Sequence, residues 1–221
     1  MFADIRVELA HRIVRIGAFL NEINEGDGSL GSGGPEAAAF KGLFFVYLYG
    51  AYERCIVDGF REALTVANSH GLICGELRPE LVGLALNNSF DSLESAPNRP
   101  IRWQTRVSLT KQIFSSDIVN FPDFGRGLRD GNHFKPAHIE TIWTLFGIGQ
   151  PVVPDPRYEN RIIELIERRH DVAHGRLRPD EVGRKFTVDE LRQRAQEVDI
   201  CCAYFVSTIE GHVTRRANLV R

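Results

Sequence analysis

The chain has 221 residues, of which 43% are hydrophobic and 25% are charged, and its formal net charge is −2. This composition is ordinary for a folded protein and excludes global disorder. The length predicts a single domain over residues 1–221. Because the whole chain is slightly negative, contact with a nucleic acid would need a local basic patch.

The cysteines and the hydropathy pattern indicate a reducing, aqueous environment. Cys55, Cys74, Cys201 and Cys202 form no CxxC pair, so we expect buried free thiols rather than a zinc cluster or a disulfide framework. Charged residues interrupt the N-terminal apolar runs, and the longest apolar stretch, 42–51, is about half of the ~20 residues that a membrane span requires. We therefore expect a soluble, cytoplasmic protein with no membrane contact.

The first third of the chain predicts two helices joined by a linker. Apolar residues recur at a spacing of three and four over residues 5–23, as in an amphipathic helix. Residues 26–34 contain five glycines without the GK[ST] ending of a phosphate-binding loop, so they predict a plain linker. The second helix should run over 35–69, from Pro35 until Gly71 closes it. Its centre is apolar on nearly every side, which predicts burial in both a core and a subunit interface.

Residues 71–135 predict an irregular insertion between the second helix and the motif helix described below. Prolines fragment its pattern, and only residues 79–86 indicate a short helix. Between Arg99 and Lys111, within the insertion, there are four basic residues, a tryptophan and no acidic residue, which is the combination of an RNA-contacting surface. They are Arg99, Arg102, Trp103, Arg106 and Lys111. The alternative interpretation is an ordinary solvated face.

The last part of the chain predicts three more helices. A short one covers residues 137–146, and a clean amphipathic helix begins at Arg157 and ends at His174 and Gly175. The final helix follows Thr187, where the sequence T-V-D-E forms a capping box. Its predicted buried stripe comprises Leu191, Ala195, Val198, Cys202, Phe205 and Ile209. Since no strand pattern of useful length occurs, the chain predicts an all-α helical bundle.

The segment LIERRHDVAHG, residues 165–175, concentrates charged and ionisable side chains at one helix end. Arg169 projects from the apolar stripe, where a guanidinium needs a partner. Glu53 shares an otherwise apolar face of the second helix, so an inward Arg169–Glu53 pair is expected, with either a structural or a functional role. His174 ends the helix and His170 lies on the same face, and such histidines either cap a helix or transfer protons near neutral pH.

The run Arg169-His170-Asp171-Val172-Ala173-His174 has the Arg-x4-His pattern of HEPN ribonucleases, and Gly175 follows it as is common there. Residues 40–62, with LFFVYLYGAYERCIVDGF, and residues 158–176 resemble stand-alone bacterial members, including the RiboL-PSP-HEPN type. His170 departs from the Asn that is frequent at its position. The resemblance implies a HEPN-type helical bundle that forms a homodimer and acts as an endoribonuclease without a metal or another cofactor.

The resemblance also implies roles for particular residues. His174 would act as general acid or base, Arg169 would bind the phosphate, and His170 would assist. Glu53 would orient Arg169. Glu167 and Asp171 would support the site, and Arg168 and Arg176, together with the basic patch, would contact RNA. Similar proteins act as toxins with an antitoxin partner or in defence against phage.

Two alternatives remain open from the residues alone. His170 and His174, with Asp171 between them, form an HDxxH pattern related to the HExxH zinc motif, for which His133, His138 or Glu167 would supply a third ligand. The protein would then be a zinc hydrolase. The second alternative is a non-catalytic HEPN-like module that binds RNA or a protein.

Overall fold

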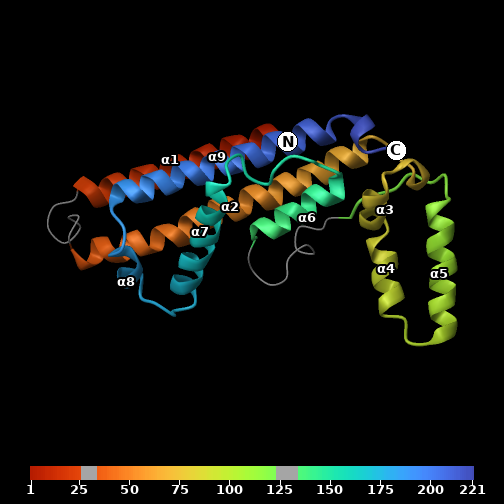
Figure 1. Cartoon of the computed structure of the whole chain (residues 1–221), viewed down its shortest axis with the longest axis horizontal. Helices are drawn as coiled ribbons and strands as arrows, with labels where there is room; N and C mark the ends of the chain where they lie inside the picture. The colour runs from red at the N-terminus through yellow and green to blue at the C-terminus, as the bar shows by residue number, and fades with distance from the viewer. Residues whose placement is uncertain (26–33, 123–133) are drawn as a thin grey trace. The chain divides into compact units, whose positions relative to one another are not determined.

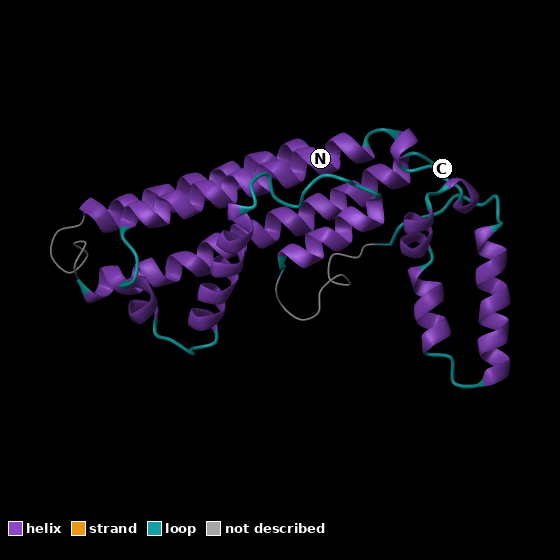
Figure 2. Ribbon diagram, viewed as in Figure 1, coloured by secondary structure: helices purple, strands orange, loops and turns teal. Residues whose placement is uncertain are grey.

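The computed structural model describes residues 1–25, 34–122 and 134–221, and these form helices and loops (Figure 2). Within them there is no β-strand beyond two isolated bridges, so the predicted all-α class is confirmed. The α-helices (Figure 1) are α1 Phe2–Glu25, α2 Pro35–Ser69, α3 Pro79–Ala85, α4 Asn87–Glu94, α5 Arg99–Ile113, α6 Pro136–Phe146, α7 Arg157–Ala173, α8 Pro179–Gly183 and α9 Val188–Val213. Two short 3₁₀ helices are η2 Cys74–Glu76 and η3 Arg216–Asn218.

The predicted linker at 26–34 falls almost wholly outside the described residues, as does His133, which the zinc alternative requires. The long helices agree with the sequence. The α2 helix has the predicted bounds, and Gly71 follows it with a left-handed φ of 61°. The capping box of α9 is also confirmed, because the Thr187 N–H donates to Glu190 Oε2 (2.7 Å) and the Glu190 N–H donates to Thr187 Oγ1 (3.2 Å).

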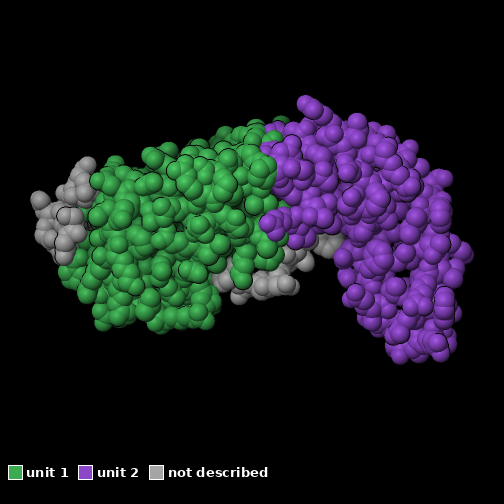
Figure 3. All heavy atoms as spheres, viewed as in Figure 1, with its two compact units in different colours: residues 1–59, 129–139, 151–207 green, residues 60–128, 140–150, 208–221 purple. Residues whose placement is uncertain are grey.

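The chain divides into two compact units (Figure 3). Among the described residues, unit 1 comprises 1–25, 34–59, 134–139 and 151–207, and unit 2 comprises 60–122, 140–150 and 208–221. Because the boundaries fall inside α2, α6 and α9, each of these three helices contributes residues to both units.

Unit 1 is a bundle of α1, α7 and the adjoining parts of α2 and α9. The predicted stripe of α9 is buried throughout, and the α1 residues Leu9, Ile16, Leu20 and Ile23 are buried as well. Hydrogen bonds join the helices at their edges, from Arg192 to Asn21 (2.9 Å) and from Arg194 to Glu164 (3.0 Å). Apolar burial supplies the main stabilisation, and these polar contacts fix the helices against one another.

The short helix α8 docks on the beginning of α2 with almost no space between the backbones. A Cβ added to Gly183 would lie 1.8 Å from the carbonyl oxygen of Ala38, and one added to Gly42 would lie 2.0 Å from that of Pro179. The Lys41 ammonium, which is buried, donates a hydrogen bond to the Phe186 carbonyl oxygen (2.8 Å). Glycine is required at both positions because any side chain would force the two helices apart.

Unit 2 corrects the prediction of an irregular insertion. Residues 71–122 contain η2, α3, α4 and α5, so most of this segment is helical. The irregular structure was predicted because the prolines of this segment were interpreted as ends of helices. Pro79 and Pro100 lie in the first turns of α3 and α5, where a missing N–H costs nothing, and Asn98 caps α5 by accepting a hydrogen bond from the Ile101 N–H (3.0 Å).

In the rest of unit 2, residues 219–221 contact the segment around Leu77. The rings of Phe60 and Phe146 pack edge to face at 6.1 Å between centroids. Leu77 forms a β-bridge with Val220, and Arg221 Nε donates to the Leu77 carbonyl oxygen (3.1 Å). Leu219 is buried, and residues 220 and 221 therefore lie against this unit.

The four cysteines are free and buried, as the sequence predicts. Burial raises the pKa of the Cys201 thiol to about 12, so this thiol is not a nucleophile at neutral pH. None of the helices in the described part of the chain combines the length and the apolarity that a membrane crossing requires.

Candidate functional site

The motif lies where α7 ends and the chain turns back. His174 is the C-cap, and its N–H donates to the His170 carbonyl oxygen (3.1 Å). Gly175 then takes a left-handed φ of 66°, which a residue with a side chain rarely adopts. This turn allows the Arg176 N–H to reach back to the Asp171 carbonyl oxygen (2.9 Å). The glycine thereby keeps Arg176 beside the last turn of α7.

The two imidazoles of the motif lie against each other at this helix end. The ring centroids of His170 and His174 are 4.4 Å apart, with His170 half-buried and His174 exposed. Partial burial lowers the pKa of His170, and the charges of Arg176, His174 and Arg169 lower it further. The lowered pKa favours the neutral form of the His170 imidazole, and the positive groups around it form a place suited to an anion.

Arg169 projects toward α2, as its place in the apolar stripe predicts. Its guanidinium carbon lies 5.1 Å from the ring centroid of Tyr49, a cation–π distance. Tyr49 is buried, and its hydroxyl accepts a hydrogen bond from the Phe134 N–H (3.1 Å), which fixes the ring. Tyr49 was not predicted as a site residue, although Tyr49 and Glu53 are four residues apart and so share one face of α2.

The other predicted site residues differ in their exposure to solvent and in their ion pairs. Glu53 is half-buried one turn after Tyr49, and its pairing with Arg169 stays a prediction. Glu167 is exposed. Arg168 forms an ion pair with Asp171 within α7 (3.1 Å), so its charge is partly neutralised before any RNA is present. Of the two arginines proposed for RNA contact here, the exposed Arg176 is the more accessible.

The predicted basic patch forms one helix, α5, in unit 2. All five of its predicted residues are exposed. The Arg106 guanidinium lies 4.8 Å from the ring centroid of Trp103, and Arg102 donates to the Ala96 carbonyl oxygen (3.4 Å). The motif belongs to unit 1.

The zinc alternative lacks a third ligand in the part of the chain that the structure describes, where no three His, Cys, Asp or Glu residues are grouped as metal ligands. Of the residues predicted to supply it, His138 instead accepts a hydrogen bond from the Lys135 N–H (2.8 Å) through Nδ1. This contact closes the first turn of α6.

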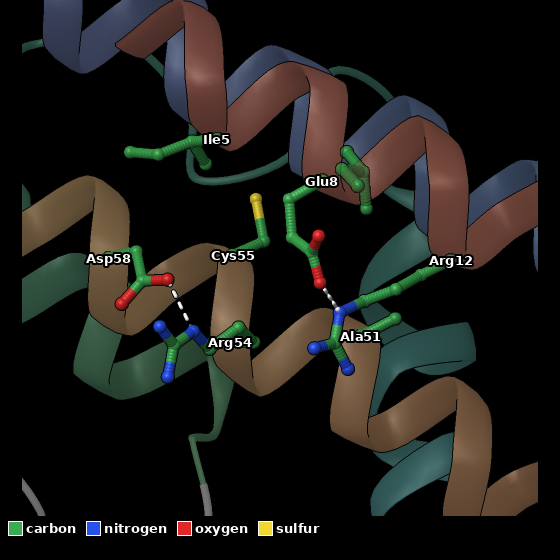
Figure 4. A pocket seen from close by; sticks show the side chains of 8 residues that line it. Ile5, Glu8, Arg12, Ala51, Arg54, Cys55 and Asp58 are labelled. Atoms are coloured by element: carbon green, nitrogen blue, oxygen red, sulfur yellow. Dashed lines mark hydrogen bonds and ion pairs between the residues drawn. The ribbon is translucent and has the colours of Figure 1, made fainter. Parts of the chain in front are cut away.

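A small cavity opens between α1 and α2 in unit 1, and its polar lining is already engaged (Figure 4). Arg12 forms an ion pair with Glu8 (2.7 Å), and Arg54 forms one with Asp58, each within its own helix. The Cys55 thiol at the cavity hydrogen-bonds weakly to the Cys202 carbonyl oxygen (3.8 Å). The polar groups that line the cavity are therefore already engaged in ion pairs or hydrogen bonds and offer little to a ligand.

The described residues form an all-α bundle, and the Arg-x4-His segment lies at the end of its amphipathic helix α7. The family model described as RiboL-PSP-HEPN matches residues 7–211, and the chain belongs to this family. The family match indicates a nuclease-type or RNA-related module. Neither the curated proteins nor the solved structures contain a significant match.

Proposed function

We propose that the protein is a metal-independent endoribonuclease whose active site is built on the Arg169-x4-His174 motif. The observation that carries the proposal is the cluster at the end of α7, where two imidazoles 4.4 Å apart lie among the charges of Arg169 and Arg176. Such a cluster offers both proton transfer and positive charge, which are what cleavage of an RNA phosphodiester needs when no metal takes part.

In the proposed reaction, the ribose 2′ oxygen attacks its own phosphorus and the bond from phosphorus to the 5′ oxygen breaks. His170, whose lowered pKa favours its neutral form, accepts the proton of the 2′ hydroxyl. His174 donates a proton to the departing 5′ oxygen. Arg169 and Arg176 bind the non-bridging oxygens, on which negative charge grows. The products carry 2′,3′-cyclic phosphate and 5′-hydroxyl ends.

The active form is proposed to be a homodimer in which the motifs of two copies share one cleft. Leu43 and Tyr47 are large apolar residues on α2 that are 43% and 45% exposed, and they lie within two turns of Tyr49, which contacts Arg169. A second copy packed on this part of α2 would cover that apolar surface. The enzyme would act on RNA in the cytoplasm, as a toxin held by an antitoxin or as an effector of phage defence.

The test is cleavage of labelled total RNA in the presence of EDTA. Wild type is compared with Arg169→Ala and His174→Ala, and the ends of the products are identified. Arg157→Ala is the matched control, because Arg157 lies at the opposite end of α7 and is 84% exposed. We expect wild type and the control to leave cyclic phosphates, while both motif variants lose at least about 100-fold in rate.

The outcomes separate the three interpretations. Cleavage that EDTA abolishes and zinc restores would support the HDxxH hydrolase. A wild-type protein that binds RNA without cutting it would support a non-catalytic module. Cleavage that survives in Arg169→Ala and His174→Ala would move the active site away from the motif.

A further inference from the structure

The α5 helix presents a continuous apolar stripe to solvent. The stripe comprises Trp103, Val107, Thr110 and Phe114, and Trp103, Val107 and Phe114 are 57%, 52% and 82% exposed. Leu109, the buried residue of α5, lies on another side of the helix. Shallow grooves run along the stripe and are lined by these side chains together with Arg106 and Lys111. So much exposed apolar surface on one helix is typical of a binding site.

The spacing of the stripe is four, three and four residues, which is the a/d pattern by which two helices pack side by side. The positions that flank such a seam carry positive charge, with Arg99 and Arg106 on one side and Lys111 on the other. No acidic residue occurs in α5. We infer that the α5 stripe binds an amphipathic helix of another protein whose apolar seam is flanked by Asp and Glu.

The same features argue against RNA as the occupant. One face of the Trp103 ring is already covered by the Arg106 guanidinium at 4.8 Å. Trp103 and Phe114 are eleven residues apart, about 16 Å along a helix, which is too far for consecutive bases to stack on both. Val107 and Thr110, which lie between them, offer methyl groups that suit a packed helix better than a nucleotide.

Charge also argues against a second copy of α5 as the partner. In a parallel pair Arg106 would face the other copy's Lys111, and in an antiparallel pair arginines would face arginines and lysines would face lysines. Either arrangement opposes like charges along the seam, whereas acidic flanks on a different helix would be attracted. The inference does not depend on ribonuclease activity, because it is argued from residues of α5 and from none of the motif.

The test uses three fluorescent probes with the whole protein. The first is a helical peptide of about three heptads with Leu at its a and d positions and Glu at e and g, the second is the same peptide with Lys at e and g, and the third is a single-stranded oligoribonucleotide. Binding is measured by fluorescence anisotropy for wild type, Val107→Asp and the double variant Arg106→Glu/Lys111→Glu. Val14→Asp, at a 70% exposed valine on α1, is the matched control.

We expect the acidic peptide to bind wild type and the control at least about tenfold more tightly than the basic peptide. Val107→Asp should lose this binding, and the charge-reversed variant should prefer the basic peptide. The inference is overturned if neither peptide binds, if the peptides bind equally well, or if only the oligoribonucleotide binds and Val107→Asp abolishes that binding. A loss of self-association in Val107→Asp, measured by sedimentation, would instead make the stripe an interface between copies.

Discussion

The Tyr49 ring contacts the Arg169 guanidinium, and the hydrogen bond from Phe134 to the Tyr49 hydroxyl fixes that ring, so Tyr49 positions Arg169. We predict that Tyr49→Leu lowers the rate of RNA cleavage by about 3- to 30-fold, since a cation–π contact contributes on the order of 0.5–2 kcal/mol. Tyr49→Phe keeps the ring and loses only the hydrogen bond from Phe134, so it should retain most of the activity. Single-turnover kinetics separates the rate from RNA affinity. Equal activity in both variants, with unchanged melting temperatures, would contradict a positioning role.

The pH dependence of RNA cleavage should reflect the titration of His170. Burial and the neighbouring positive charges lower the pKa of His170 below its ordinary value of 6.5. A base acts only when it is neutral, so activity should persist below pH 6.5 and fall only as the pH drops through the lowered pKa. His170→Asn should remove this acidic limb from the rate profile and reduce the rate. An acidic limb that stays in place in the variant would assign the base to another group.

Sequence spacing predicts that the motif residues lie together at one helix end, but it does not predict that Tyr49 contacts Arg169. Arg169, His170 and His174 follow one another on a single helix, so their spacing determines that they gather at its end. The contact with Tyr49 joins residues 120 positions apart, and it depends on how α7 crosses α2, which local spacing does not determine. The same limit applies to Glu53, whose pairing with Arg169 was argued from two helical faces alone.

Among the helices, the contact of α8 with α2 is the one most sensitive to a small change. We predict that Gly183→Ala lowers the free energy of unfolding by about 1–3 kcal/mol, because the new Cβ would overlap the Ala38 carbonyl oxygen. Gly17→Ala is the matched control, since a Cβ there meets no atom within 4 Å and alanine favours a helix over glycine by up to about 1 kcal/mol. Urea denaturation measures the free energy of unfolding of both variants. Equal stability of the two variants would show that α8 does not pack as described.

The helices also show where sequence patterns succeed and fail. The bounds of α2 and α7 were predicted to within a residue or two, because a capping residue or a glycine marks their ends and their apolar stripes are long. The helices α4 and α5 were missed because the prolines between and near their ends were interpreted as breaks. The apolar spacing of four, three and four residues in α5 is visible in the sequence, but it was not used to predict a helix there.

At the scale of the whole molecule, the proposed dimer can be tested on α2. Leu43→Asp combined with Tyr47→Asp places two charges on the apolar surface that a second copy would cover. We predict that this variant sediments as a monomer and cleaves RNA at least about tenfold more slowly, because burying an unpaired carboxylate is costly. Ile200→Asp on α9 is the matched control, since Ile200 is 44% exposed. A monomeric variant with full activity would show that one copy suffices for catalysis.

Since α2, α6 and α9 each contribute residues to both compact units, the polypeptide has no point at which one cut would release an intact half. A fragment that ends inside α2 or α6 would lose core residues from both units and would expose their apolar partners to water. Gene fusion or recombination could therefore transfer the whole segment but neither unit by itself. The family match over residues 7–211, which includes residues of both, agrees with inheritance of the segment as one piece.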